Sequence, residues 1–384
     1  MSGPLTGLRV IELASIGPGP MCAMLLADQG ADVTRVDRVE PSGLGVPLDP
    51  RHDVTGRGRR SIALDLKHPV GRDAVLRLID RTDVLIEGWR PGVAERLGLG
   101  PDDCAARNPR LVYGRMTGYG QSGPLAQAAG HDINYIALTG ALHAIGPAGG
   151  APVPPLNLIG DYGGGALYLA FGLMAALYER ERSGRGQVVD AAMVDGASSL
   201  LSIFHGMLAA RRWDDSRRGA NLLDGGAPFY GTYATSDGRH VALGALEPKF
   251  FRAFCQAAGR PDLAERQFDD GGRGPRDELE AIFASRTRDE WERFGAEHDV
   301  CVAPVLEGEE PARDPQLRAR GMFLSVDTPW EGKAMASLRT PVRLLGADPA
   351  LRPAPRLGEH TRDVLAEAGF AEAEVASLQA AGVI

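Results

Sequence analysis

The chain has 384 residues, 44% of them hydrophobic, and a formal net charge of −8. This length predicts two domains, and the acidic balance argues against a nucleic-acid-binding protein, which would usually be basic. The four cysteines form no CxxC pair, so we expect neither a zinc site nor a disulfide framework, and a cytoplasmic location is the simplest expectation. The N-terminal segment "MSGPLTGLRV" lacks a basic stretch followed by an apolar run, so no signal peptide is expected.

Residues 1–200 predict an α/β domain. The apolar run "LRVIELA" (8–14) predicts a strand, "MCAMLLADQG" (21–30) a helix and "ADVTRVD" (31–37) a second strand. The alternation continues with a helix at 71–82, strands at 83–88 and 110–120, and a strand and helix within 187–201. This order predicts a mostly parallel sheet, in which ligands bind beyond the carboxyl ends of the strands.

The most apolar run of the chain is "ALYLAFGLMAALY" (166–178). It is shorter than the roughly 20 residues that a membrane-spanning helix needs. We therefore expect a buried helix and no membrane partner.

The character of the sequence changes after residue 200. The charged and glycine-rich stretch 201–225 predicts a linker. Two alternating runs around Ser-Asp-Gly predict a hairpin at 229–246, and helical patterns follow at 247–258 and 276–297. We interpret 226–335 as a smaller α+β domain.

The turn "GPGPMC" after the first strand partly matches the G-x-G-x-x-G fingerprint of dinucleotide binding. Asp37 stands where a ribose-binding acid would lie. However, Cys22 replaces the third glycine, and Pro18 and Pro20 have no backbone N–H to offer a pyrophosphate. A tight strand–helix turn is therefore favoured over NAD binding.

Cationic side chains gather in the first quarter of the chain. They are Arg38, Arg51, Arg57, Arg59, Arg60, Lys67, Arg90 and Arg96. Guanidinium groups offer planar, paired donors that suit a ligand with several phosphates. The alternative is a set of solvated loop arginines paired with nearby Asp and Glu, and the sequence leaves both interpretations open.

Two polar residues stand out in the glycine-rich middle of the chain, His131 in "GHDINY" and Asp161 in "NLIGDYGGG". Asp161 is either a helix N-cap or an acid beside backbone amides that a ligand can approach closely. His131 is either a histidine hydrogen-bonded within a loop or a group that exchanges a proton near neutral pH. Glu247, in "LGALEPKFF", is a third candidate, either as a helix-start acid or as a residue that orients His131 from the second domain.

Several segments between residue 3 and about residue 369 together resemble the family III CoA-transferases, and within them the α-methylacyl-CoA racemase branch. They are "GPLTGLRVIELASIGPGP", "GADVTRVDR", "EGWRPGVAERLGLGP", "RMTGYGQSGP", "GHDINYIALTGAL", "PPLNLIGDYGGG", "GRGQVVDAAMVDG" and "GEHTRDVLAEAG". The resemblance is dense through residue 198, looser between 255 and 340, and clear again near the C-terminus.

This resemblance implies an interlocked homodimer in which each subunit has a large Rossmann-like domain, formed by 1–200 and 336–384, and a small domain. It implies the CoA thioester of a 2-methyl-branched acid as the substrate, without a metal or a further cofactor. By motif position, His131 and Asp161 become the acid/base pair that inverts C2 through an enolate. Glu247 becomes an acid beside the histidine, contributed by the small domain of the partner.

The resemblance also implies which residues hold CoA or border the thioester. They are Arg38, Leu64, Asp65, Leu66, Lys67, Gly88, Trp89, Arg90, Arg96, Gly130, Asp132, Ile133, Asn134 and Tyr135. The close alternative is CoA transfer, in which Asp161 attacks the thioester as a nucleophile. Such transferases have no general need of a histidine in "GHDINY", so His131 favours proton transfer.

Overall fold

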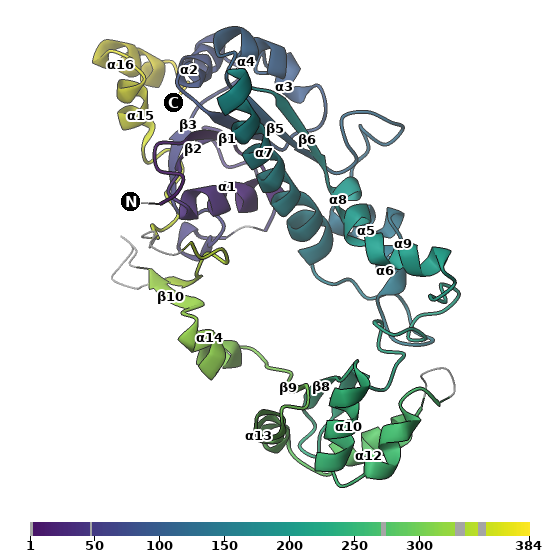
Figure 1. Ribbon diagram of the computed structural model, residues 1–384. Coiled ribbons are helices and arrows are strands. Elements are labelled where there is room, and N and C mark those ends of the chain that lie inside the picture. Colours follow the sequence, from purple (N-terminus) through teal and green to yellow (C-terminus); the bar gives the residue numbers. More distant parts are fainter. Residues whose placement is uncertain (1–2, 47, 270–273, 327–334, 345–350) are drawn as a thin grey trace. The chain divides into compact units, whose positions relative to one another are not determined.

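The computed structural model describes residues 3–46, 48–269, 274–326, 335–344 and 351–384 (Figure 1). The chain divides into two compact units. The larger unit contains 1–139, 156–200 and 315–384, and the smaller unit contains 140–155 and 201–314. Each unit has apolar core residues of its own.

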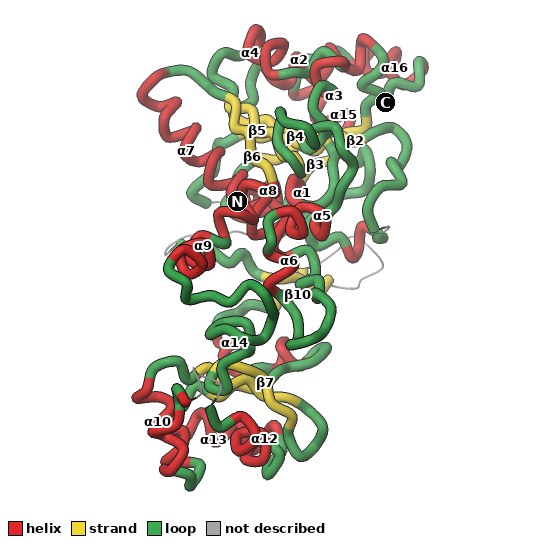
Figure 2. Tube along the Cα trace, turned by 90° about the vertical axis from the view of Figure 1, so that its right-hand side faces the viewer, coloured by secondary structure: helices red, strands yellow, loops and turns green. Residues whose placement is uncertain are grey.

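A six-stranded parallel sheet lies at the centre of the larger unit, with the strand order β3-β2-β1-β4-β5-β6 (Figure 2). Its strands are β1 (Arg9–Leu13), β2 (Asp32–Asp37), β3 (Arg59–Ala63), β4 (Val84–Glu87), β5 (Val112–Thr117) and β6 (Val188–Ala192). The strand order reverses between β1 and β4, and ligands of such sheets bind beyond the carboxyl ends at that point. The predicted α/β fold with a parallel sheet is confirmed. The sequence pattern does not predict β3, because the strand begins with Arg59 and Arg60 and its apolar run is short.

Helices cover both faces of this sheet, because successive strand residues point to opposite faces. Ile11 and Leu13 pack with apolar side chains of the helices at 69–79, 101–107, 361–367 and 372–380. Val10 and Val84 point to the other face and pack with the helices at 18–28 and 167–183. The helices of the larger unit are α1 (Pro18–Asp28), α2 (Pro69–Ile79), α3 (Val93–Arg96), α4 (Pro101–Arg107), α5 (Asp132–Leu138), α7 (Leu167–Ser183), α8 (Met193–Leu200), α14 (Pro315–Ala319), α15 (Thr361–Glu367) and α16 (Glu372–Ala380), with the 3-10 turn η1 (Pro50–His52) and the π-helix η2 (Leu158–Ala166).

The apolar helix α7 is longer and more exposed than the sequence indicates. Together with η2 it runs from Leu158 to Ser183, long and apolar enough by length and composition to cross a membrane, and 33% of its most apolar stretch is buried. Leu173 is buried against Gly114 of β5, whereas Phe171 is 73% and Tyr178 70% exposed. The expectation of a short, buried helix is therefore wrong. One face of α7 packs on the sheet, and the opposite face is apolar and exposed.

The C-terminal segment covers the edge strand β3, whose backbone groups would otherwise be unpaired. The His360 amide donates to the Ser61 carbonyl (2.9 Å), and the Ala63 amide donates to Thr361 Oγ1 (3.0 Å). Further along, the Asp65 amide donates to a carbonyl in the tail that follows α16. The returning tail therefore holds the segment that follows β3. A separate antiparallel pair in the larger unit consists of β10 (Phe323–Val326) and β11 (Met335–Leu338).

The smaller unit combines an antiparallel sheet with short helices around an aromatic core. β7 (Tyr230–Ala234) and β8 (His240–Gly244) form the predicted hairpin, and β9 (Val302–Pro304) pairs with β8. Its helices are α6 (Ala141–Ala144), α9 (Ser202–Ala209), α10 (Pro248–Ala257), α12 (Arg276–Phe283) and α13 (Arg288–His298), with the 3-10 turns η3 (Pro261–Arg266) and η4 (Glu310–Arg313). The single helix predicted over 276–297 is broken, because Thr287 caps a new helix by accepting from the Glu290 amide.

The two units are divided at other positions than the domains expected from the sequence. Residues 201–225, expected as a linker, belong to the smaller unit together with 140–155, and 315–326 belong to the larger unit. Within the smaller unit, Arg218 donates to the carbonyl of His143 (3.1 Å), and the His143 ring lies 3.0 Å from the Asp215 carbonyl. These contacts tie the expected linker to 140–155.

Candidate active site

Most of the segments predicted to hold CoA lie at the carboxyl edge of the parallel sheet. Arg38 follows β2, Leu64–Lys67 follow β3, and Gly88–Arg90 follow β4. The carboxyl ends of parallel strands meet at one edge, so these segments gather there despite their separation in sequence. Their cationic side chains, and that of Arg96 in α3, are exposed and have no ion-pair partner within the described part of the chain. They are available to an anionic ligand.

A buried ion pair that the sequence does not reveal holds the segment after β4. The Trp89 amide donates to Glu87 Oε2 (2.7 Å), and the Trp89 indole donates to the Ala14 carbonyl (3.1 Å). Arg115 of β5 pairs with Glu87 (2.9 Å). Burial raises the pKa of Glu87, and the Trp89 amide and Arg115 oppose that shift. The carboxylate therefore orders the backbone from which Arg90 projects.

The arginines of the 51–60 span are all paired with carboxylates, and two of them are buried beyond the reach of a phosphate. Arg57 and Arg59 are 1% and 2% exposed, and they pair with Asp28 (2.6 Å) and Glu12 (2.7 Å). The other two pair nearer the surface, Arg60 with Asp32 and Glu367, and Arg51 with Asp49. The phosphate interpretation is therefore wrong for Arg57 and Arg59, and the fold also supplies Arg51 and Arg60 with carboxylate partners.

The glycine–proline turn after β1 contacts Asp161. Gly17 has a φ of 69°, which favours glycine, and a Cβ at this position would lie 3.0 Å from Asp161 Oδ2. Asp37, the candidate ribose ligand of the sequence analysis, already accepts from Arg35 (3.0 Å) and Ser61 (2.6 Å). The turn therefore brings the start of α1 against the Asp161 carboxylate. In a dinucleotide-binding protein the corresponding turn would face a pyrophosphate.

His131 immediately precedes α5 and is exposed. Its amide donates to Asn134 Oδ1 (3.0 Å), and the Asn134 amide donates back to the His131 carbonyl (2.8 Å). Tyr135 is buried, packs edge-to-face on Tyr119 with ring centroids 4.9 Å apart, and donates its hydroxyl to the Gly130 carbonyl. These contacts fix the backbone of His131, while its ring has no hydrogen-bond partner among the described residues.

Asp161 lies inside the π-helix η2 and not at a helix N-cap, so the N-cap interpretation of the sequence is wrong. Asn157 donates its side-chain amide to Asp161 Oδ2 (3.1 Å), and the Asp161 amide donates to Asp132 Oδ1 (2.7 Å). The glycines that follow allow close packing, since a Cβ at Gly164 would lie 2.6 Å from the backbone nitrogen of Ala197 in α8. The sequence does not reveal the Asn157 and Asp132 contacts.

The histidine and the aspartate are close enough to interact. Asp161 is hydrogen-bonded to the residue that follows His131, and the charge of His131 lowers the Asp161 pKa. That pKa is nevertheless raised overall, first because burial removes water from the carboxylate and also because the Asp132 carboxylate is near, whereas the Asn157 hydrogen bond opposes the shift. A carboxyl group with raised proton affinity beside an imidazole is suited to give and take a proton.

Glu247, the third predicted catalytic residue, belongs to the smaller unit. It is the exposed residue before α10, and its side chain makes no cap hydrogen bond there. Its charge, after burial, raises the pKa of the Cys301 thiol, so the two side chains are neighbours. The role of Glu247 beside the histidine stays a prediction.

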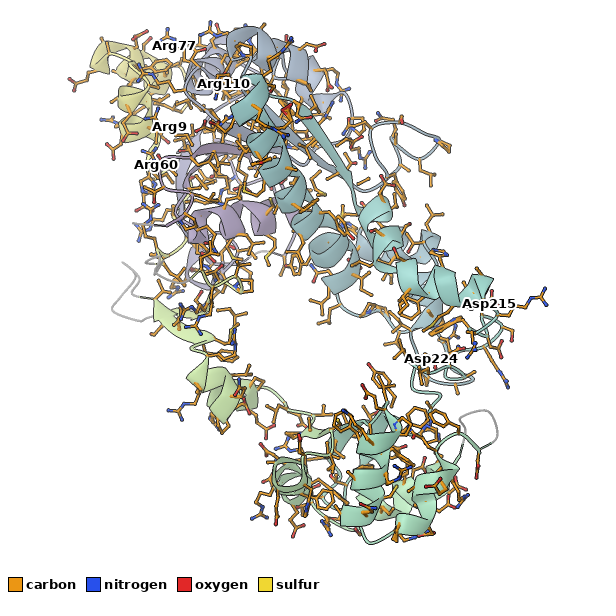
Figure 3. All side chains as sticks on the ribbon, viewed as in Figure 1. Arg9, Arg60, Arg77, Arg110, Asp215 and Asp224 are labelled. Atoms are coloured by element: carbon orange, nitrogen blue, oxygen red, sulfur yellow. The ribbon has the colours of Figure 1, made fainter. Side chains whose placement is uncertain are left out.

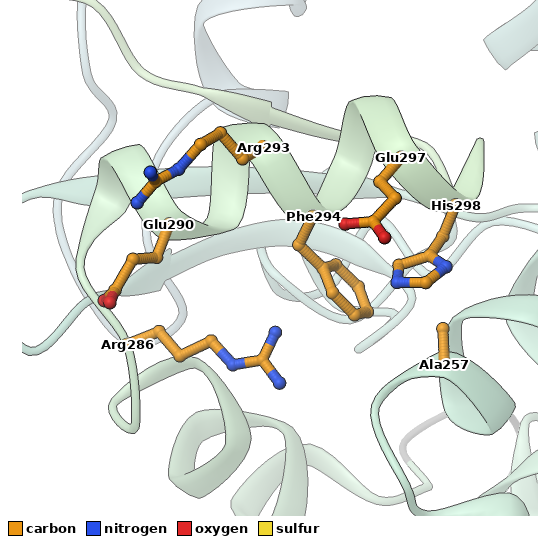
Figure 4. A pocket seen from close by; sticks show the side chains of 7 residues that line it. All are labelled: Ala257, Arg286, Glu290, Arg293, Phe294, Glu297 and His298. Atoms are coloured by element: carbon orange, nitrogen blue, oxygen red, sulfur yellow. The ribbon is translucent and has the colours of Figure 1, made fainter.

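Two pockets of the described chain include none of these residues in their linings. A surface pocket of about 320 Å³ in the smaller unit is lined by Ala257, Arg286, Glu290, Arg293, Phe294, Glu297 and His298 (Figure 4). A pocket of about 120 Å³ at the amino edge of the parallel sheet is lined in part by Arg9, Arg60, Arg77 and Arg81, three of which Figure 3 labels. Asp32 and Glu367 also line it and pair with Arg60. No group of three His, Cys, Asp or Glu side chains in the described residues is placed to hold a metal ion.

The chain belongs to CoA-transferase family III, whose profile matches residues 5–361. It is 42% identical over 385 residues to the alpha-methylacyl-CoA racemase of Mus musculus, covering 99% of this chain and 97% of that protein. It is 33% identical over 407 residues to the succinyl-CoA–D-citramalate CoA-transferase of Chloroflexus aurantiacus, covering 99% and 98%. A solved CAIB/BAIF family protein from Brucella suis superposes with a TM-score of 0.78 at 28% identity, covering 96% of this chain and all of that one. The family predicted from the motifs is confirmed.

Proposed function

We propose that the chain is a racemase that inverts C2 of 2-methyl-branched acyl-CoA thioesters by proton transfer. The observation that carries this proposal is the hydrogen bond from Asp161 to the residue that follows His131, which brings an imidazole and a carboxyl group to one site. The identity to the mouse racemase over almost the whole chain supports it.

The two groups would divide the reaction between the two faces of C2. Inversion requires one group to remove the proton and another to deliver a proton to the opposite face of the planar enolate. His131 and Asp161 would exchange these roles with the direction of the reaction, and such proton transfers contribute about 10²–10⁴-fold each. A single group that returned the proton to its own side would leave the configuration unchanged.

The enolate oxygen also needs hydrogen-bond donors. The Asp161 amide is already engaged by Asp132 Oδ1 (2.7 Å), so it is not such a donor. The amides of Asp132 and Ile133, the first two of α5, follow His131 directly and have no acceptor among the described residues, whereas the Asn134 amide donates to the His131 carbonyl. We assign the thioester oxygen to this turn, with the phosphates and ribose of CoA held by the exposed cations that follow β2, β3 and β4.

The proposed assembly is a homodimer in which Glu247 of the partner subunit orients His131. The apolar face of α7 supports a protein partner, because Phe171 and Tyr178 are exposed on this helix while its Arg180 is buried and paired with Asp83. A helix so anchored to its own sheet offers its outer face to a second copy of the chain more readily than to lipid. Light scattering would show a dimer that Phe171→Glu converts to a monomer. A monomeric wild-type protein would contradict the assembly.

Mixing two inactive variants tests whether Glu247 acts across subunits. In a mixed dimer of Glu247→Gln and His131→Ala chains, one of the two sites keeps both wild-type residues. Random mixing would restore roughly a quarter of the wild-type activity, because half of the dimers are mixed and half of their sites are complete. Activity no greater than that of the separate variants would place Glu247 elsewhere.

Exchange of the C2 proton tests the racemase directly. The wild-type protein, incubated in D₂O with one enantiomer of a 2-methylacyl-CoA, is expected to incorporate deuterium at C2 while the two enantiomers equilibrate. A panel of acyl chains in the same assay would identify the acyl group. Absence of exchange with every 2-methylacyl-CoA would overturn the proposal.

CoA transfer is the second candidate, because the chain is 33% identical to a CoA-transferase over almost its full length. In that reaction the Asp161 carboxylate would attack the thioester carbon, release CoA as the thiolate and form a mixed anhydride. Hydroxylamine would trap an acylated Asp161 as a hydroxamate that mass spectrometry detects. A trapped adduct formed during turnover would favour transfer, and C2 exchange without an adduct would favour racemisation.

A further inference from the structure

The carboxylate of Asp132 lies between the two segments that bear the proton-transfer groups. Asp132 is 6% exposed and is the first residue of α5, immediately after His131. Its Oδ1 accepts the amide hydrogen of Asp161 at 2.7 Å, and Asp161 belongs to the π-helix η2. It is therefore a direct side-chain connection between the start of α5 and the middle of η2.

The packing around this carboxylate is close. A Cβ on Gly160 would lie 2.5 Å from Asp132 Oδ1, so any other residue at that position would displace the carboxylate. Asp132 Oδ2 is also buried and has no hydrogen-bond partner among the residues that the structure describes. A buried charged oxygen without a partner is unfavourable for folding, and a fold that retains one needs a reason other than stability.

We propose that Asp132 is a positioning residue for the proton transfer described above, which sets the Asp161 carboxyl group against His131 and supplies a fixed negative charge beside it. This inference rests on the proposed racemase function. It differs from a role of Asp132 in binding CoA, because it assigns the side chain to the acid/base pair and not to the ligand.

The negative charge has a chemical use in a racemase. The same two groups must act as acid and base in both directions, so their proton affinities should be similar. Ordinary aspartate and histidine side chains differ by about 2.6 pKa units. The pKa of Asp161 is raised first by burial and then by the Asp132 charge, whereas the Asn157 hydrogen bond and the His131 charge lower it. The charge of Asp132 therefore raises the proton affinity of Asp161 toward that of an ordinary histidine.

No other charged side chain competes with this effect in the described surroundings of Asp161. The start of α1 faces the carboxylate through Gly17, and α8 meets the π-helix through Gly196 and Ala197. From α5 the groups that act on it are His131 and Asp132. Removal of the Asp132 charge should therefore lower the Asp161 pKa.

Two substitutions distinguish the hydrogen bond that Asp132 accepts from the negative charge that it supplies. Asp132→Asn keeps an oxygen for the Asp161 amide and removes the charge. It should lower kcat about tenfold, leave KM within about twofold, and move the limb of the kcat–pH profile set by Asp161 to lower pH. Asp132→Ala removes both contributions and should lower kcat about 100-fold, as expected when a reacting group is misplaced by about 1 Å. Asp195→Asn, an exposed change on α8, is the matched control and should leave kcat and its pH profile unchanged.

The outcomes distinguish this inference from the proposed function. Suppose that the wild-type protein exchanges the C2 proton in a way that depends on Asp161, but Asp132→Asn has an unchanged kcat and pH profile. This result would overturn the role of Asp132 and leave the racemase proposal standing. A loss confined to KM would assign Asp132 to CoA binding and would also overturn it. An Asp132→Asn protein that does not fold would show that the carboxylate serves the fold, with the same consequence. Absence of C2 exchange in the wild-type protein would instead overturn the racemase proposal.

Discussion

Two groups of charged side chains in the larger unit differ in what the fold provides for them. Arg57 and Arg59 both contact α1, and each is paired with a carboxylate and almost fully buried. Arg38 and Arg90, at the carboxyl edge of the sheet, are exposed and have no ion-pair partner in the part of the chain that the structure describes. Arg57 and Arg59 can stabilise the fold but cannot reach a ligand. Arg38 and Arg90 form no stabilising ion pair with another described residue but can reach a ligand.

The same contrast separates two carboxylates. Glu12 is fully buried, and burial raises its pKa, but the adjacent Arg59 guanidinium opposes that shift. Asp161 is only partly buried and has a second carboxylate, Asp132, beside it instead of an arginine. A local density of charge in a sequence therefore does not identify a binding or catalytic site. The identity of the neighbour across the fold decides between a structural and a chemical role.

The largest effect is expected for the two residues that we propose transfer the proton. His131→Ala and Asp161→Ala should each lower the rate at which the two enantiomers interconvert by about 10²–10⁴-fold, because each removes the acid or base from one face of C2. Circular dichroism and thermal unfolding would show that both variants fold. Interconversion of the enantiomers at the wild-type rate in either variant would refute its assigned role and remove the contrast between the catalytic and the structural charges.

Next in size is the loss of a buried pair. Arg59→Met should lower the free energy of unfolding by about 3–5 kcal/mol, because it leaves the Glu12 carboxylate buried without its partner. Urea unfolding measures this change. Arg38→Met, the matched substitution at the carboxyl edge, should change stability by less than about 0.5 kcal/mol. Similar losses in the two variants would remove the distinction between the two arginine groups.

A smaller effect is expected on CoA binding. Arg90→Met should raise KM for the acyl-CoA roughly tenfold and leave kcat within about twofold, because a hydrogen bond to a charged group contributes about 1.5–3 kcal/mol. Arg51→Met, in the span whose arginines are paired with acids, should leave KM unchanged. An equal rise of KM in both variants would count against the assignment of the exposed cations to CoA.

The smallest effect is a pH-dependent change in stability. The pKa of Asp161 is raised in the folded protein, so the folded state binds the proton more tightly, and this contribution is lost as the pH rises through the folded pKa. Asp161→Asn has no carboxyl group to ionise at this position, so its stability does not fall in this way as the pH rises. Near pH 7.5 it should be slightly more stable than the wild type, by less than about 1 kcal/mol. The difference should vanish below about pH 4, where both states of the wild type are protonated. A wild type that is more stable than the variant at neutral pH would contradict this sign.

The regular elements of the larger unit could be predicted to a large extent from the sequence. The apolar runs that form β1, β2, β4 and β5 have the length and pattern of buried parallel strands, and the helices between them have clear periodicity. β3 could not be predicted in this way, because its first two residues are arginines. Arg59 is buried by its pair with Glu12 and Arg60 pairs with surface acids, and an apolar pattern in the sequence does not reveal such pairs. The π-helix around Asp161 could not be predicted either, since glycines at that position are equally typical of a loop.

The candidate site shows the same division. The residue types and spacing of "GHDINY" and "NLIGDYGGG" are sufficient to single out His131 and Asp161. The side chains that complete the site, Asn157 and Asp132, could not be assigned from the sequence, because their roles depend on a contact between α5 and η2.

The amino-acid sequence by itself thus determined the family to which the chain belongs and, apart from β3, the order along the chain of the strands in the parallel sheet. Only the tertiary structure decided which arginines are paired and buried, which stay exposed at the sheet edge, and which carboxylate lies beside Asp161. The physical reason is that local pattern records the balance of apolar and polar residues along the chain. The proton affinity and availability of a charged group are set by neighbours that are distant in sequence.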